Sequence, residues 1–480
     1  MMQREKLGSR LGFILISAGC AIGLGNVYRF PIITGSYGGA AFVLVYLVFL
    51  VLLGLPVMTA ELAVGRASQR SIASSFDVME RPGQKWHLMK YVGIGGNYLL
   101  MMCYTLITGW MLRYFLKYLT GAMEGVGDQE AFKEVFGQMA GGTGLNVLAT
   151  YAVIAVGLGI CALGLQKGVE RITKWMMVAL LALLVGLAAY SCTLSNAAEG
   201  LRFYLIPSFT DMKEAGVGTV INAAMGQAFF TLSLGIGSIA IFGSYIGKER
   251  RLLGEAVTIV SLDTFVALMS GLIIFPACFT YNNGVTADAG TVNPSFLFTT
   301  LSSIFNEMPG GRIVGTLFFL FMLFAALSTV IAVFENIVSF WLEKTRLSRR
   351  MVCLINIALM MVLCLPAIFS QSFLGDFKIL GFNMMDLEDA IVAKLLLPVG
   401  SLVYVLFCTT RYGWGFKNYL GEVNTGKGMS APRWLRWCVS HLLPRRMRAG
   451  MAKVWPWLLK GYMRYVLPLI IAVVLVLSFI

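Results

Sequence analysis

The sequence contains little charge. Of its 480 residues only 13% are Asp, Glu, Lys or Arg, whereas 58% are hydrophobic. Soluble globular domains have about 25% charged residues, so this composition excludes a soluble domain and indicates an integral membrane protein. The apolar runs are long enough to cross about 30 Å of hydrocarbon, which excludes an outer-membrane barrel of short, alternating strands.

Metal-binding and disulfide patterns are also missing. The chain has only two histidines, His87 and His441, and both lie in polar segments, so a histidine metal site is not expected. No two of the nine cysteines form a CxxC pair, and most lie within apolar runs, where they are expected to be small buried hydrophobic residues. No linker rich in Pro, Gly or Ser divides the chain, which predicts a single domain over residues 1–480.

Eleven membrane spans are predicted. They cover residues 11–36, 38–65, 91–120, 146–164, 172–191, 219–246, 255–280, 312–342, 351–370, 387–410 and 462–480. With the N-terminus in the cytoplasm, 29 of the 38 Lys and Arg residues lie in cytoplasmic segments, as the positive-inside rule requires. The net charge of +14 therefore reflects membrane topology rather than nucleic-acid binding, and the odd number of spans places the C-terminus outside.

Two spans are interrupted by glycines, in GCAIGLGN at residues 19–26 and in FFTLSLGIG at residues 229–237. Glycine weakens a helix by about 1 kcal/mol relative to alanine, and a broken helix in lipid exposes backbone groups that need partners. An ion and a polar solute can be those partners, so the breaks predict a binding site near the bilayer midplane. Because the broken spans 1 and 6 are five spans apart, two inverted repeats are expected, residues 11–191 and 219–410, with the last span, 462–480, outside them.

Several motifs resemble one family closely. GLGNVYRFP (23–31), GGAAF (38–42), GLP (54–56), ELAVGR (61–66) and QAFFTLSLG (227–235) match the neurotransmitter:sodium symporter family, in particular its bacterial, leucine-transporter-like branch. The resemblance extends from residue 4 to about residue 410. It implies an all-α polytopic membrane protein with inverted repeats of five helices each, broken helices 1 and 6, and eleven transmembrane helices.

The resemblance also implies two sodium sites. The first consists of the Ala21 carbonyl, the Asn26 amide oxygen, Thr231 oxygens and the Asp263 side chain, and a substrate carboxylate completes it. The second consists of the carbonyls of Gly19, Ile22 and Ala325 and the hydroxyls of Ser328 and Thr329. Taken alone, the two hydroxyls are more often bonded back to their own helix.

The implied substrate site lies between the breaks, where half-helix N-termini suit a carboxylate. Tyr104 resembles the family tyrosine that binds this carboxylate. Relatives that carry biogenic amines have an aspartate at the position of Gly23, so glycine favours a substrate with its own carboxylate, an amino acid. The residues expected at the site are Ala21, Gly23, Gly25, Leu100, Tyr104, Ile107, Phe230, Thr231, Ser233, Ile236, Thr329 and Val333. The apolar members favour a hydrophobic amino acid, although such residues taken alone are more often plain core.

Charged residues inside spans are costly in lipid and are usually paired or functional. By resemblance, Arg29 and Asp389 form an outer gate, with Asp386 as an alternative acid. The inner gate is expected to consist of Arg4, Tyr245 and Glu343. Glu61 is expected to have a structural hydrogen-bonding role, and Lys394 either neutralises a nearby acid or lines a water-filled cavity.

Asp263 departs from the chloride-dependent relatives, which have an amide at its position and a serine four residues later, where this chain has Ala267. With Tyr46 and Gln227 beside it by similarity, the Asp263 carboxylate is expected to supply the negative charge that chloride provides elsewhere. No chloride requirement is therefore expected. A static counter-charge at the first sodium site is the alternative.

These features predict a multi-pass protein of the cell (inner) membrane. It is expected to couple two sodium ions to amino-acid import by alternating access. It is not expected to be an enzyme. The expected partners are the amino acid and the lipid bilayer, without nucleic acid, and the protein is expected to be a monomer or a homodimer. Two alternatives stay open: a proton-coupled or exchanging amino-acid transporter of the same fold, and a sensor or scaffold that binds an amino acid without transporting it.

Overall fold

The computed structural model describes residues 7–281, 295–427 and 458–479, and these residues are almost entirely helical. In the first half of the chain the helices are α1 (Arg10–Ala21), η1 (Gly25–Arg29), α2 (Phe30–Ser36), α3 (Ala40–Phe49), η2 (Leu50–Gly54), α4 (Leu55–Ser68), α5 (Ser75–Met79), η3 (Trp86–Leu88), α6 (Met89–Leu119), α7 (Gln129–Gly141), α8 (Thr143–Ala162), η4 (Leu165–Glu170), α9 (Arg171–Ser191), α10 (Ala197–Leu205) and α11 (Phe209–Glu214).

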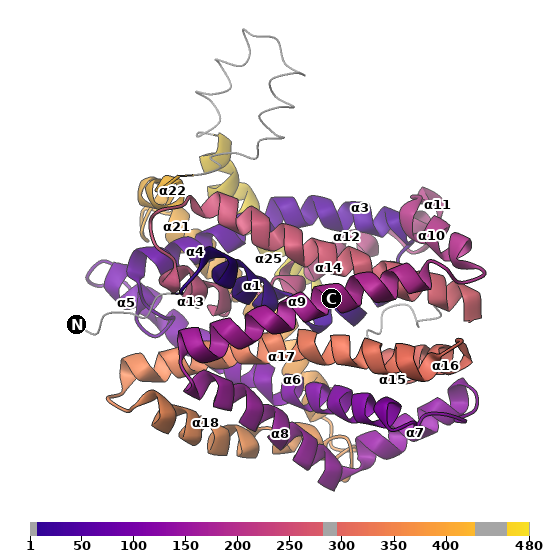
Figure 1. Cartoon of the computed structure of the whole chain (residues 1–480). Helices are drawn as coiled ribbons and strands as arrows, with labels where there is room; N and C mark the ends of the chain where they lie inside the picture. Colours follow the sequence, from indigo (N-terminus) through magenta and orange to yellow (C-terminus); the bar gives the residue numbers. More distant parts are fainter. Residues whose placement is uncertain (1–6, 282–294, 428–457, 480) are drawn as a thin grey trace.

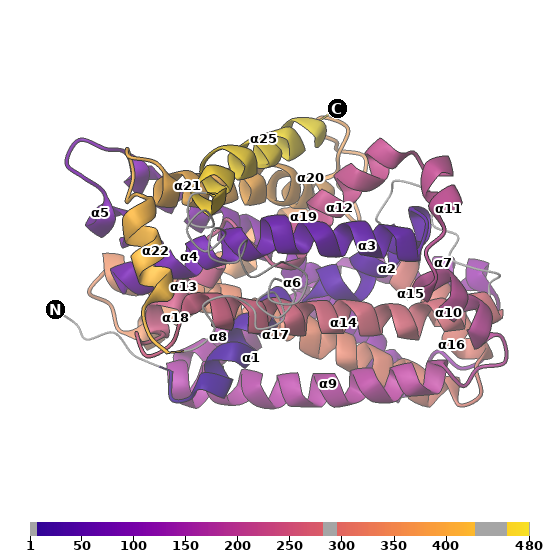
Figure 2. The same ribbon diagram turned by 90° about the horizontal axis from the view of Figure 1, so that it is seen from above.

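In the second half they are α12 (Val217–Thr231), α13 (Ser238–Tyr245), α14 (Leu252–Tyr281), α15 (Ser295–Phe298), α16 (Thr300–Glu307), α17 (Gly311–Lys344), α18 (Arg349–Leu363), α19 (Leu365–Phe369), α20 (Met384–Ala390), η5 (Ile391–Leu396), α21 (Leu397–Thr409), α22 (Phe416–Asn424), η6 (Tyr462–Val466) and α25 (Leu467–Leu477). The long helices lie side by side (Figures 1 and 2). Helices α5, α13 and α22 lie at one end of this bundle, and α7, α10, α11 and α16 lie at the other.

Nine helices of the described residues are long and apolar enough to cross a membrane, and a bent pair makes a tenth. This pair is α1 with the continuous segment Gly25–Ser36, which bends by 59° at the first glycine break. At the second break, residues 232–237 separate α12 from α13, and each of these helices is too short to cross a bilayer alone. The eleven spans predicted from the sequence include this divided one.

Prolines account for several wide helical turns. The π-helical segments η1, η2, η5 and η6 are each followed directly by an α-helix with proline in its first turn: Pro31, Pro56, Pro398 and Pro468. Because proline has no N–H to donate to the carbonyl four residues earlier, the preceding turn widens without ending the span.

The segments between spans that the predicted topology places outside the membrane contain short helices. Residues 121–145 contain α7, residues 192–218 contain α10 and α11, and α15 and α16 lie within residues 281–311. These short helices gather at one end of the bundle, which is opposite the end that holds α5 and α22 (Figure 2). The segments that were predicted to share a side of the membrane thus share an end of the molecule.

Candidate functional site

The two helix breaks touch. Ser233 has a left-handed backbone, with φ at 50°, and its hydroxyl donates to the Cys20 carbonyl at 3.4 Å. At Gly235, with φ at 97°, an added Cβ would lie 2.3 Å from the Leu397 carbonyl oxygen. Only glycine permits both this backbone conformation and this close approach. Gly235 therefore lets the second break pack against α21, while Ser233 joins it to the first break.

Two buried side chains brace the second break. The Glu61 carboxylate accepts hydrogen bonds from the backbone N–H groups of Gly235 (3.0 Å), Ile239 (3.1 Å) and Ala240 (3.3 Å). Asn97 of α6 donates to the Ile236 carbonyl at 2.9 Å. A carboxylate at the start of a helix satisfies N–H groups that have no partner within it. This geometry gives Glu61 the structural role expected from the sequence.

The five residues of the second predicted sodium site come together. The Ser328 hydroxyl donates to the carbonyls of Gly19 (3.0 Å) and Ala325 (2.9 Å). The Thr329 hydroxyl lies 3.2 Å from the Gly19 oxygen, 3.3 Å from that of Ile22 and 3.4 Å from that of Ala325. Three carbonyls and two hydroxyls thus converge between the first break and α17. Such uncharged oxygen donors at an unwound helix suit Na⁺.

Three of the four residues predicted for the first sodium site also meet. The Asn26 side-chain nitrogen lies 2.8 Å from one Asp263 carboxylate oxygen, and the Thr231 hydroxyl donates to the other at 3.2 Å. The Asn26 amide oxygen accepts from the Gly23 N–H at 3.2 Å. Ala21 is buried nearby in the same break. For the Asn26 oxygen to join Asp263 and Thr231 around a cation, the amide would have to rotate by half a turn and give up its hydrogen bond from the Gly23 N–H.

Residues predicted to replace chloride surround Asp263, which is fully buried. The buried Tyr46 hydroxyl lies close enough to interact with Thr231 and with the Asp263 charge. Gln227 donates to the Gly25 carbonyl at 2.9 Å, while its side-chain oxygen is buried without a partner. Within the described chain, no Lys or Arg lies within ion-pair distance of Asp263.

The predicted substrate residues gather around Tyr104. Its hydroxyl accepts from the Leu24 N–H at 3.1 Å. A Cβ on Gly23 would lie 2.5 Å from this hydroxyl and 2.8 Å from the Thr329 hydroxyl, and a Cβ on Gly25 would lie 2.9 Å from the Phe230 ring. Both glycines therefore let these side chains pack directly against the backbone of the break. Of the apolar residues predicted here, Leu100, Ile107, Ile236 and Val333 are buried and Phe230 is partly exposed.

The predicted outer gate is not a direct ion pair. The Arg29 guanidinium lies over the Phe230 ring, 4.0 Å from its centroid, and its Nε has no hydrogen-bond partner. No Arg29–Asp389 contact within 4 Å occurs among the described residues. Both Arg29 and Lys394 lie close enough to act on the Asp389 charge, and the role of Lys394 stays a prediction. Asn383 instead caps α20 by accepting from the Asp386 N–H at 2.9 Å, and its side-chain nitrogen donates to the Asp386 carboxylate at 2.8 Å.

The inner end contains a network that the sequence reasoning missed. The Tyr245 hydroxyl donates to Glu335 at 2.9 Å, and Arg349 binds the same carboxylate through two nitrogens at 2.8 and 3.1 Å. Glu343 accepts from the Ser71 N–H at 2.7 Å, and Arg4 lies outside the described residues. An acid in the middle of the apolar span 312–342 was the signal that could have identified Glu335.

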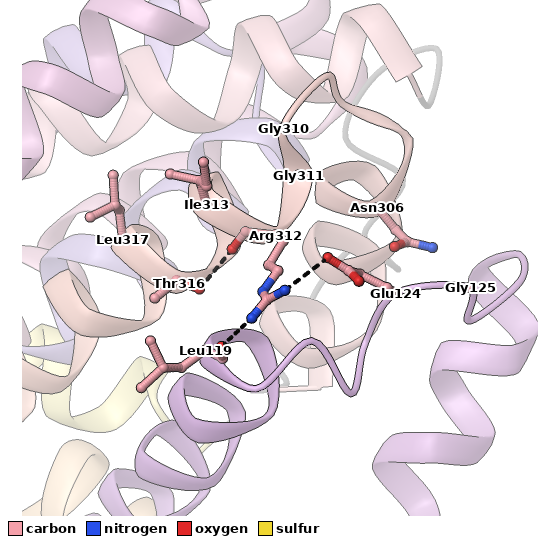
Figure 3. A pocket seen from close by; sticks show the side chains of 10 residues that line it. All are labelled: Leu119, Glu124, Gly125, Asn306, Gly310, Gly311, Arg312, Ile313, Thr316 and Leu317. Carbon is pink, nitrogen blue, oxygen red and sulfur yellow. Dashed lines mark hydrogen bonds and ion pairs between the residues drawn. The ribbon is translucent and has the colours of Figure 1, made fainter.

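A pocket of about 970 Å³ lies elsewhere, at the outer surface between the end of α6 and the start of α17. Figure 3 shows Arg312 reaching from α17 to the Leu119 carbonyl and to Glu124, beside the apolar side chains of Ile313 and Leu317. None of the predicted site residues lines this pocket.

Comparison with known proteins agrees with the resemblance. The profile of the sodium:neurotransmitter symporter family matches residues 4–127 and 137–479. The chain belongs to this family. The symporter is 31% identical over 429 residues to YhdH, an uncharacterised sodium-dependent transporter of Bacillus subtilis (strain 168), a match that covers 89% of this chain and 92% of that protein.

Two further relatives bear on the fold and the substrate. The crystal structure of MhsT in complex with L-phenylalanine superposes with a TM-score of 0.83 at 34% identity, covering 100% of both chains. The rat sodium-dependent neutral amino acid transporter B(0)AT2 is 27% identical over 301 residues, 57% of this chain and 40% of that protein. The symporter thus has the fold of MhsT, and its relatives are membrane transporters, not enzymes.

Proposed function

We propose that this sodium-dependent transporter imports a hydrophobic amino acid and needs no chloride. The observation that carries the proposal is the close approach of the Tyr104 and Thr329 hydroxyls to Gly23, which leaves no room for a side chain there. An acidic side chain at this position would clash with both hydroxyls and would also repel a substrate carboxylate. The complex of MhsT with L-phenylalanine and the name of the rat relative support an amino acid.

Two sodium ions are proposed. Asp263, Asn26, Thr231 and the Ala21 carbonyl would hold the first, and the substrate carboxylate would complete its shell. Gly19, Ile22, Ala325, Ser328 and Thr329 would hold the second. A carboxylate beside the first ion balances its charge, so substrate and sodium stabilise each other's binding.

Polar side chains on the outer and inner sides of the site support a mechanism of alternating access. Arg29 and Asp389 would close over the substrate on the outer side, while Tyr245 and Glu343, with Glu335 and Arg349, close the inner side. The inverted repeats 11–191 and 219–410 would supply the rocking elements around this fixed site. The protein would lie in the cell (inner) membrane with its N-terminus in the cytoplasm and its C-terminus outside.

Uptake by the purified chain in proteoliposomes tests the proposal. Labelled L-phenylalanine, L-leucine and other amino acids are supplied with sodium outside, inside or absent, and with chloride replaced by gluconate. We expect accumulation that needs external sodium and persists in gluconate. Uptake that follows a pH gradient without sodium would favour the proton-coupled alternative, and saturable binding without accumulation would favour the sensor.

A separate variant tests the proposal that transport needs no chloride. Asp263→Asn removes the buried carboxylate without changing its size, and we expect it to lower uptake in gluconate by about tenfold or more, with partial recovery in chloride. Glu255→Gln is the matched control, since Glu255 is a buried acid of the same helix that pairs with Arg10 at 3.0 Å. Loss of uptake in the unchanged protein on replacing chloride would contradict the proposal.

A further inference from the structure

Glu388 is a buried acid with no role in the mechanism above. It lies in α20, next to Asp389, and its side chain is 2% exposed. Neither of its carboxylate oxygens has a hydrogen-bond partner among the residues that the structure describes. A carboxylate buried without hydrogen bonds or an opposite charge is strongly destabilised relative to water, and such a group takes up a proton instead.

The surroundings of Glu388 offer no compensating charge. Helix α20 packs against α6 and α19, and the groups on these sides that interact with the Glu388 charge are the thiols of Cys103 and Cys364. On its own helix the other ionisable groups are Asp386 and Asp389, both acidic.

The nearest cations are engaged elsewhere. Arg29 stacks on Phe230 at 4.0 Å, and the Lys394 ammonium lies 5.8 Å from the centroid of the Phe382 ring. Among the described residues, no Lys or Arg nitrogen lies within 4 Å of the Glu388 carboxylate. Glu388 is therefore buried without a charged partner in the part of the chain that the structure describes.

We infer that Glu388 is a proton-binding site of the outer gate: it carries a proton while α20 is packed against α6 and α19, and releases it when gate opening admits water. Ionised Glu388 opposes the repacking of α20, because closure would bury its charge. Protonation therefore favours the closed outer gate, and external pH controls the gate. The inference concerns a proton rather than the amino acid, and rests on the proposed transport only for its effect on uptake.

Infrared spectroscopy tests the proton directly, without substrate. The full-length chain in liposomes is titrated between about pH 5 and 9 while the carbonyl stretch of protonated carboxylic acids is recorded. We expect a component that disappears with rising pH and is missing from both Glu388→Gln and Glu388→Leu. Glu388→Leu needs no hydrogen bonds in its apolar surroundings, so it covers the case in which the amide variant does not fold. Asp376→Asn, which alters an exposed acid upstream of α20, should keep the component.

Uptake tests the effect on the gate. The initial rate of sodium-driven L-phenylalanine uptake should fall as external pH rises at constant internal pH. Because one proton is involved, the fall should be at most tenfold per pH unit. Both Glu388 variants should lose this fall and Asp376→Asn should retain it. An infrared component that is unchanged in the variants, or the absence of any Glu388 component over this range, would overturn the proton site. Identical pH profiles for the unchanged and variant proteins would overturn the gating role. If no amino acid is taken up, the proposed substrate fails while the infrared result still decides the proton site.

Discussion

At the scale of single residues, Thr329 distinguishes a binding role from ordinary helix geometry. A buried helical threonine usually donates to the carbonyl four residues earlier, as Thr105 does to Met101 at 2.7 Å. Thr329 lies 3.4 Å from that carbonyl, that of Ala325, and nearer to two carbonyls of the broken span, at 3.2 and 3.3 Å. Its hydroxyl is therefore placed for a ligand shared between α1 and α17.

Replacing Thr329 with valine should weaken sodium binding specifically. Valine preserves the volume and removes one of five oxygen donors, so the sodium concentration for half-maximal uptake should rise by about tenfold or more, equivalent to about 1.4 kcal/mol. Sodium titration of uptake measures this rise. Thr105→Val removes a comparable buried hydroxyl outside the site and should leave the sodium dependence unchanged. Equal shifts in both variants would argue against a sodium ligand at Thr329.

The sequence predicted the contacts of the first sodium site but not the pairing of Glu335 with Arg349, and the reason is physical. Asn26 and Thr231 lie in motifs shared with the family, and Asp263 was expected beside them by resemblance; the three do lie within hydrogen-bond distance. Glu335 and Arg349 carry no such motif, and their pairing depends on how α17 and α18 pack. A charge in an apolar run signals that a partner exists, but not which residue it is.

At the scale of elements, the second break depends on glycine at one position rather than on glycine content. Gly235 combines a φ of 97° with backbone atoms of α21 at 2.3 and 2.8 Å from an added Cβ. Gly226, in the regular part of α12, would place a Cβ in open space. The same residue type is thus required at one site and replaceable at the other.

Alanine at these two glycines should have opposite effects. Gly235→Ala cannot be accommodated without moving α21, so we expect little folded protein, whereas Gly226→Ala should be neutral or stabilise α12 by up to about 1 kcal/mol. The yield of monodisperse protein and its melting temperature in detergent measure both effects. A stable, active Gly235→Ala variant would contradict the close approach of the break to α21.

The ion pair between α17 and α18 makes a second prediction at this scale. Arg349→Met leaves the fully buried Glu335 carboxylate without its cation and should destabilise the protein by about 3–5 kcal/mol. The double variant Glu335→Gln/Arg349→Met removes the unpaired charge and should recover much of this loss. Melting temperatures of the single and double variants form the double-mutant cycle. Additive losses would show that the two side chains are not coupled.

At the scale of the whole molecule, polar contacts join segments that were assigned to the same side. At one end Arg66 binds Glu422 at 2.6 Å, and Ser71 donates to Glu343 at 2.7 Å. At the other end Tyr190 donates to the Pro309 carbonyl at 2.8 Å. The uneven distribution of Lys and Arg orients the first of these ends toward the cytoplasm.

Thiol labelling tests that orientation. Among the described cysteines Cys192 is exposed and the others are buried, and Cys192 follows α9 at the predicted outer end. An impermeant maleimide should label intact cells that express the unchanged chain, and Cys192→Ser should abolish this labelling. A Lys85→Cys substitution in a Cys192→Ser/Cys438→Ser background places a thiol in the predicted cytoplasmic segment 66–90 and should react only after permeabilisation. The reverse pattern would invert the topology.

The sequence by itself determined the class of protein, the positions of the spans, the two breaks and the expected sidedness, because apolar length, glycine and basic charge act locally along the chain. Only the tertiary structure decided which polar groups meet. Glu61 accepts from the N–H of Gly235, 174 residues away, and Arg349 pairs with Glu335. The same holds for Glu388, whose carboxylate oxygens have no hydrogen-bond partner among the described residues. Each buried polar group needs a partner or a proton, and only the packing of distant helices decides which of the two it obtains.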